Sequence, residues 1–90
     1  MTRLQIETKV NILPFPEEIN VVGQTLVEKT EEQIRKDVTY RVGEADSKNY
    51  SQKEKLNLAL SFYYLNDWQN YNLWLKAAKE MDPNERYFLK

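Results

Sequence analysis

Residues 56–83 read LNLALSFYYLNDWQNYNLWLKAAKEMDP, a stretch that decides the fold of the chain. Apolar side chains recur at spacings of three and four residues on both sides of Asn66-Asp67, which indicates two amphipathic helices joined by a short turn. Pro83 cannot continue a helix and therefore ends the second one. The sequence predicts a helix pair over residues 51–83. Because a single pair of helices buries little surface, we expect it to pack against something else.

The first helix of the pair is apolar on two sides. It begins at Ser51, which forms a capping-box pattern with Glu54. One apolar stripe consists of Leu56, Ala59, Leu60, Tyr63 and Tyr64, and a second consists of Leu58, Phe62 and Leu65. A helix that is apolar on two sides is expected to be buried on two sides.

The second helix also carries two apolar stripes. The first consists of Trp68, Tyr71, Leu75 and Ala78, and the second of Trp74, Ala77 and Met81. We expect the first stripe to pack on the preceding helix, so the second needs other cover. The candidates are the tail over residues 84–90, the N-terminal arm or a second molecule. The sequence therefore predicts self-association, most simply as a homodimer, with Trp74 and Met81 at the contact.

Residues 3–13 alternate between apolar and polar side chains, the pattern of a half-buried strand. Pro14 and Pro16 end this pattern. Two interpretations stay open. Residues 1–15 form an extended arm across the helices, or the strand pairs with a second copy, because a lone strand leaves backbone N–H and C=O groups without partners.

A helical pattern follows over residues 16–43. One long helix is the first expectation. Thr30 and Gln33 also match a capping box, which would divide the segment into two helices. The alternation over residues 38–42 leaves a short strand there as a further alternative. Residues 43–50 are rich in turn-forming side chains, and we expect a loop.

These elements predict one mainly α domain over residues 1–90, a small three-helix bundle with an extended N-terminal arm or strand. The composition agrees, since the chain has only two glycines and three prolines. It contains no cysteine and no histidine, which removes disulfides, thiolate metal sites and the commonest general base. We therefore expect no enzyme activity, no metal and no cofactor. The net charge of −1 and the lack of a long apolar run favour a cytoplasmic protein without affinity for membranes.

The helix pair resembles a single, degenerate tetratricopeptide repeat, a family whose unit is a helix pair. The resemblance rests on Leu58, Ala59, Phe62, Asn66-Asp67-Trp68, Leu75, Ala78 and Asp82-Pro83. Two positions depart from the family pattern. Tyr71 stands where a small residue usually opens the packing face of the second helix, and Lys55 stands where tryptophan is usual. The implied fold is a tetratricopeptide-like bundle.

The resemblance implies a groove for a partner on the first helix of the pair. The residues that it places there are Lys53, Asn57, Leu60, Tyr63 and Tyr64. Some family members grip a peptide carboxylate with a pair such as Lys53 and Asn57. The same two residues also fit a plain solvated face beside a core helix.

The sequence thus predicts a non-catalytic protein–protein interaction or assembly module. Its predicted partner-binding residues are Trp74, Met81, Tyr63, Tyr64, Lys53 and Asn57. The partner is a second copy or another protein. The alternative is binding of single-stranded nucleic acid by the aromatic and basic C-terminal half. The net charge makes nucleic acid the less favoured partner.

Overall fold

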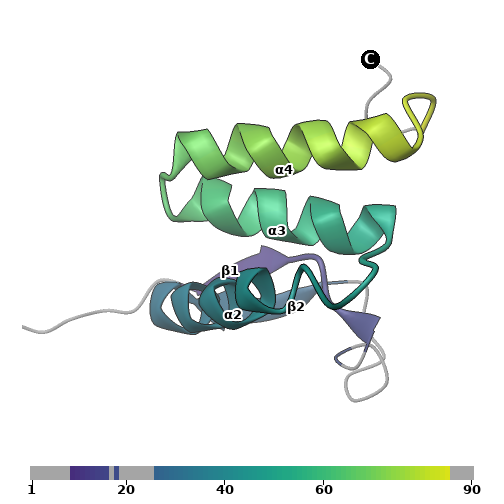
Figure 1. Cartoon of the computed structure of the whole chain (residues 1–90). Coiled ribbons are helices and arrows are strands. Elements are labelled where there is room, and N and C mark those ends of the chain that lie inside the picture. Colours follow the sequence, from purple (N-terminus) through teal and green to yellow (C-terminus); the bar gives the residue numbers. More distant parts are fainter. Residues whose placement is uncertain (1–8, 17, 19–25, 86–90) are drawn as a thin grey trace, which may run out of the picture.

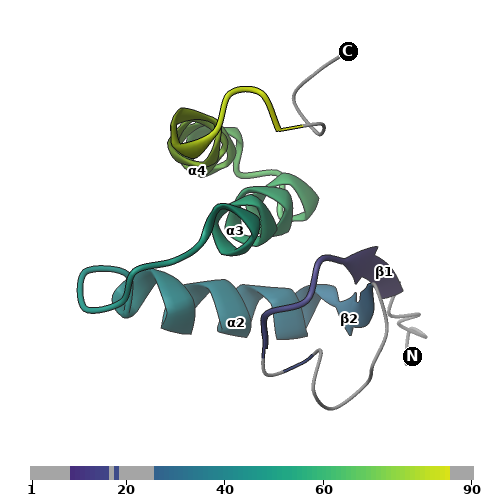
Figure 2. The ribbon, with the colours of Figure 1, turned by 90° about the vertical axis from the view of Figure 1, so that its right-hand side faces the viewer.

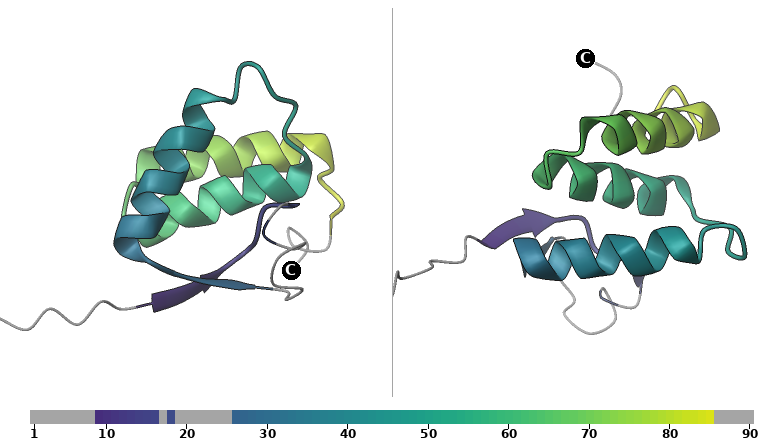
Figure 3. Two further views of the ribbon diagram at one scale, coloured as in Figure 1. Left: turned by 90° about the horizontal axis from the view of Figure 1, so that it is seen from below. Right: turned by 60° about the vertical axis from the view of Figure 1, so that its left-hand side comes forward.

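Three helices and a two-stranded sheet make up the described part of the chain, which covers residues 9–16, 18 and 26–85 of a computed structural model. The elements are β1 (Lys9–Ile12), β2 (Val27–Thr30), α2 (Glu31–Gly43), α3 (Gln52–Tyr64) and α4 (Trp68–Met81). Helix α3 forms the middle layer, with α4 on one side and α2 and the strands on the other (Figure 1). Helices α3 and α4 run side by side, whereas α2 crosses them obliquely (Figure 3). This part of the chain is mainly helical, as the sequence predicted.

Helix α3 is buried on more than one side, as its two apolar stripes predicted. Its buried residues are Leu56, Asn57, Leu58, Ala59, Ser61 and Phe62. Figure 2, which looks along the helix, shows α4 above it and α2 below it. The middle position therefore explains why residues 56–59, 61 and 62 are all buried.

The bounds and caps of the predicted helix pair are confirmed. Ser51 and Glu54 form the expected capping box at the start of α3. Asp67 caps α4, and α4 ends at Met81, after which the backbone is extended. The side-chain amide of Gln52 donates to the carbonyl of Ala78 at 2.9 Å. This hydrogen bond ties the start of α3 to the last turn of α4, where helix carbonyls lack intrahelical partners.

The prediction of one long helix over residues 16–43 is wrong. Residues 27–30 form a strand, and α2 begins only at Glu31. The capping box of Thr30 and Gln33 is present, so this local signal was correct. Residues 38–42 are helical, so the alternative of a strand there is also wrong. Most of the stretch before residue 26 lies outside the described residues.

The predicted N-terminal strand is described only over Lys9–Ile12, since residues 1–8 lie outside the described part. It pairs antiparallel with β2, with Lys9 opposite Thr30 and Ile12 opposite Val27. The described strand thus finds its partner within the same chain, which neither interpretation of the sequence anticipated. The same segment does lie against the helices, because Ile12 is buried and the Tyr64 hydroxyl donates to the carbonyl of Asn11 at 3.4 Å.

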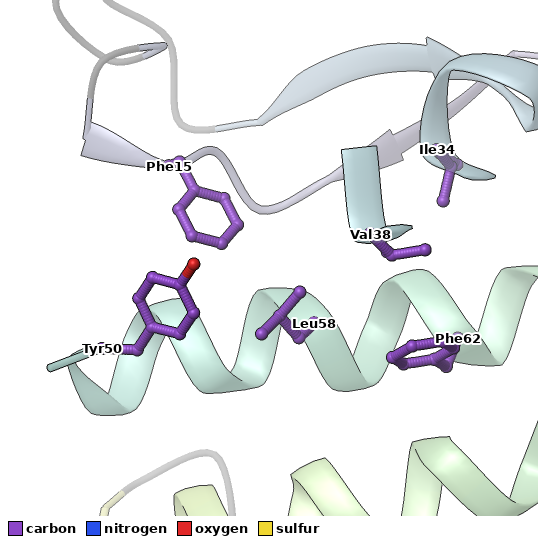
Figure 4. Packing of buried hydrophobic residues seen from close by; sticks show 6 residues of the cluster. All are labelled: Phe15, Ile34, Val38, Tyr50, Leu58 and Phe62. Atoms are coloured by element: carbon purple, nitrogen blue, oxygen red, sulfur yellow. The ribbon is translucent and has the colours of Figure 1, made fainter. Parts of the chain in front are cut away.

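One cluster of side chains joins the layers. It consists of Phe15, Ile34, Val38, Tyr50, Leu58 and Phe62 (Figure 4). Phe15 lies between two groups: the Arg41 guanidinium is 3.6 Å from its ring centroid, and the Tyr50 ring meets it edge to face at 5.8 Å. The Tyr50 hydroxyl also donates to the carbonyl of Arg41 at 2.7 Å. Phe15 thereby fastens the segment after β1 to α2 and to the loop before α3.

A partly buried ionic network supports this arrangement. The Lys29 ammonium lies 2.9 Å from a Glu18 carboxylate oxygen and 3.0 Å from one of Asp37. Asp37 also accepts from the Arg41 guanidinium at 2.8 Å. Because Glu18 accepts from the backbone N–H of Phe15 at 2.8 Å, the network connects β2 and α2 to the Phe15 segment.

We predict that Phe15→Ala lowers the free energy of unfolding by about 3–5 kcal/mol, because it removes a fully buried ring from the centre of the cluster. Urea unfolding followed by circular dichroism measures the loss. Tyr40→Ala is the control, since Tyr40 is 62% exposed, and it should change stability by less than about 1 kcal/mol. Equal effects of the two substitutions would contradict the assignment of Phe15.

We also predict an alkaline loss of stability through Tyr50. Burial raises the pKa of the Tyr50 hydroxyl above its ordinary value of 10.0, and the charge on Arg41 offsets part of this effect. The native state therefore holds the proton more tightly than the unfolded chain. The stabilisation is complete below the unfolded-state pKa and is lost as the pH rises through the higher native-state pKa. Urea unfolding between about pH 8 and about pH 11 should show a shallower decline for Tyr50→Phe than for wild type. Parallel declines would exclude this role.

Candidate functional site

The six residues predicted to bind a partner do not form one surface. Tyr63 and Tyr64, at the C-terminal end of α3, are 45% and 40% exposed. Met81, at the C-terminal end of α4, is 50% exposed, and Lys53 is exposed near the start of α3. Tyr63 contacts Trp68 at the start of α4, so Met81 lies about 20 Å from it at the other end of the pair, given a rise of about 1.5 Å per residue.

The expected position of Trp74 on an outer face is corrected. Trp74 is partly buried and packs against the core cluster, as Tyr71 does. Helix α4 is turned so that the boundary between its two apolar stripes faces α3, with Ala78 fully buried at the contact. Trp74 and Met81 both line one open hollow of about 490 Å³, which Tyr50 also lines. The predicted Trp74–Met81 patch is therefore incomplete, because Met81 is exposed and Trp74 is partly buried.

The expected position of Asn57 in a groove is also corrected. Asn57 is fully buried, and its carbonyl accepts from the Ser61 hydroxyl at 2.8 Å. Its side-chain nitrogen Nδ2 has no hydrogen-bond partner among the described residues. Residues 57, 61 and 64 share one side of α3, and Tyr64 reaches Asn11 of β1. Since Lys53 is exposed and Asn57 is buried, the two side chains do not form a joint binding site for a carboxylate.

Four aromatic side chains gather where α3 meets α4. We call Tyr63, Tyr64, Trp68 and Tyr71 the aromatic cluster. The Tyr63 ring lies 5.2 Å from Trp68, 5.4 Å from Tyr71 and 5.8 Å from Tyr64, measured between centroids. Trp68 is 50% exposed and contacts Tyr71 at 6.2 Å. The cluster combines an inner ring, Tyr71, that packs on the core with three outer rings that are open to solvent.

The turn between α3 and α4 holds the cluster in place. Asn66 adopts a left-handed backbone conformation with φ of 61°, which asparagine tolerates better than most residues. The N–H of Asp67 then donates to the carbonyl of Phe62 at 2.9 Å. The Asp67 carboxylate accepts from the backbone N–H and the side-chain amide of Asn70. Trp68 follows directly, so a fixed backbone positions it beside Tyr63.

A groove of about 540 Å³ lies beside the cluster, between α2 and the α3–α4 turn. Val38, Phe62 and Leu65 supply its apolar side chains. The other lining residues are Arg35, Thr39, Asn66, Asp67, Trp68 and Gln69. Trp68 belongs to both features, so the cluster and the groove form one continuous surface at this end of the helix pair, which is at the left of Figure 1.

Sequence reasoning found part of this surface. It selected Tyr63 and Tyr64, but it assigned Trp68 to the packing face of α4. The groove also depends on α2, whose oblique crossing has no signature in the sequence. The position of Trp68 directly after a turn was the one available signal, because first-turn residues are covered by fewer neighbours than those in the middle of a helix.

Among the described residues, no group of three or more Asp and Glu side chains is arranged to hold a metal ion. None of the described helices is long and apolar enough to cross a membrane. Comparisons with protein-family models, curated proteins and solved structures give no match to this chain.

We predict that Asn57→Leu leaves the protein folded and raises its free energy of unfolding by about 1 kcal/mol, since it removes a buried amide nitrogen that has no partner in the described part of the chain. Urea unfolding measures the change. Ser61→Ala is the matched control on the same side of α3 and should be neutral or destabilising, because the Ser61 hydroxyl is bonded. A loss of more than about 2 kcal/mol in Asn57→Leu would contradict this prediction.

Proposed function

We propose that this chain is a non-catalytic protein-interaction module that binds its partner through the aromatic cluster and the adjoining groove. The observation that carries the proposal is the cluster itself, three rings that are 40–50% exposed and packed against one another. Tryptophan and tyrosine dominate the binding energy of protein interfaces, since they offer large apolar faces together with polar groups.

The ring packing also lowers the entropic cost of binding. Tyr63 touches Tyr64, Trp68 and Tyr71, and Tyr71 is anchored on the core. Side chains held by neighbours lose less conformational freedom on binding than isolated surface side chains, which improves affinity. A folded protein keeps such rings on its surface at some risk of aggregation, so their exposure favours a binding role.

The resemblance to a tetratricopeptide repeat supports the proposal in part. The α3–α4 hairpin consists of two helices of similar length joined by a short turn, the general form of the family's unit. The binding surface, however, lies at the hairpin end, and it shares only Tyr63 and Tyr64 with the implied groove. The absence of histidine and cysteine from the sequence supports a role without catalysis.

Nucleic acid is supported less well. Stacking of bases on aromatic rings requires nearby cations to bind the phosphates. The residues next to the cluster in sequence are Asn66, Asp67, Gln69 and Asn70, which carry amides and one negative charge. The chemistry around the rings therefore favours a polypeptide.

The test compares wild type with the double variant Tyr63→Ser/Trp68→Ser, using Tyr40→Ser as the matched control for loss of an exposed aromatic ring. Each immobilised protein is exposed to an extract, and captured proteins are repurified and titrated by calorimetry. Sedimentation equilibrium detects a partner that is a second copy. Wild type and control should bind alike, and the double variant should bind at least about 30-fold more weakly, the effect of losing a 2 kcal/mol contact. Equal binding or equal self-association by all three would refute the proposal.

A further inference from the structure

The occupant of this surface can be specified further. Resting on the proposed function, the geometry points to a short, uncharged, proline-rich segment of another protein, bound in the extended polyproline conformation across the aromatic cluster. Three features carry this inference: the size of the exposed surface, the angles between the rings and the charges around them.

The three exposed rings alone are too small for a stable dimer interface. Aromatic side chains have about 150–250 Å² of surface each, so three rings that are 40–50% exposed offer only about 300 Å². A stable protein–protein interface needs about 800 Å² from each partner. A surface of this size, with one adjoining groove, fits a peptide of a few residues better than a second folded copy.

The rings form ridges instead of a flat platform. Tyr63 and Trp68 meet at 72°, Tyr63 and Tyr64 at 80°, and Trp68 and Tyr71 at 84°. Steep angles alternate ring faces with ring edges, so the exposed surface is ridged. Pyrrolidine rings are rigid and apolar, and they recur on one side of a polyproline helix every third residue, so they can pack against successive ring faces. An amphipathic helix would instead need a long apolar trough.

The charges around the surface do not select a charged ligand. Arg35 pairs with Glu31 at 2.7 Å, and the Asp67 carboxylate accepts from Asn70 at 2.8 Å. The exposed rim side chains Asn66 and Gln69 are amides. A polyproline segment makes no internal hydrogen bonds, so its carbonyls are free to accept from amide and tyrosine donors. An uncharged ligand rich in acceptors therefore complements this rim.

The probe for the test is a capped proline decamer, and a capped glycine–serine decamer is the control peptide. The ¹⁵N-labelled protein is titrated with each, and the indole N–H signals of Trp68 and Trp74 are followed separately. We expect the proline decamer to shift the Trp68 signal saturably, while Trp74, which packs on the core, changes little. The glycine–serine peptide should leave both signals in place.

Variants assign the effect to the cluster. Binding to the decamer, measured by calorimetry, should weaken at least tenfold in Trp68→Ala, less in Trp68→Phe, and not at all in Tyr40→Ala. The amide spectrum of each variant shows whether it is folded. Should Trp68→Ala lose its fold, Tyr64→Ser takes its place, with a loss of binding again expected.

Three results would overturn the inference. They are the absence of a saturable shift at Trp68, equal shifts with both peptides, and a Trp68 signal that moves on dilution of the protein alone, which would assign the surface to a second copy. The proposed function can stand even if this inference fails. A partner that still requires Tyr63 and Trp68, although the proline decamer does not bind, would exclude the polyproline class and leave the interaction module standing.

Discussion

The packing of Phe15 between Arg41 and Tyr50 is the contact on which the rest of the structure depends. Helix α4 covers only one side of α3, and α2 crosses α3 obliquely, so neither helix alone closes the core. Phe15, which follows β1 in the sequence, fills the remaining space. Phe15 touches Arg41 of α2 and Tyr50 in the loop before α3. One ring therefore holds three parts of the chain in a fixed arrangement.

The ionic network around Lys29 contributes more to the geometry of the Phe15 contact than to the stability of the fold. Its side chains are 11–20% exposed, so bringing their charges out of water offsets much of the attraction between them. What the network supplies is geometry. Asp37 can accept from Lys29 and Arg41 together only when β2 and α2 are correctly placed, and that placement holds the Arg41 guanidinium over Phe15.

Local signals in the sequence predicted the helix ends, and long-range contacts explain what they missed. The caps at Ser51, Thr30 and Asp67 each depend on residues within three positions, and all three are present. The pairing of β1 with β2 joins residues that are 15 to 21 positions apart, and no nearby residue signals it. Asn57 is a further case: the resemblance placed it in a groove on α3, whereas it is fully buried.

The orientation of α4 about its axis explains both the surface proposed for binding and the loss of the predicted Trp74–Met81 patch. Residues in a helix follow one another at about 100°, so Trp68 and Trp74, six positions apart, point about 120° away from each other. Only one of them can face α3 fully. With Trp74 against the core, Trp68 is directed outward beside Tyr63, whose own side chain reaches α4 at the turn. Met81, seven positions after Trp74, lies on nearly the same side of α4 but in its last turn, where it stays exposed. The rotation of one helix therefore decides which tryptophan is structural and which is available to a partner.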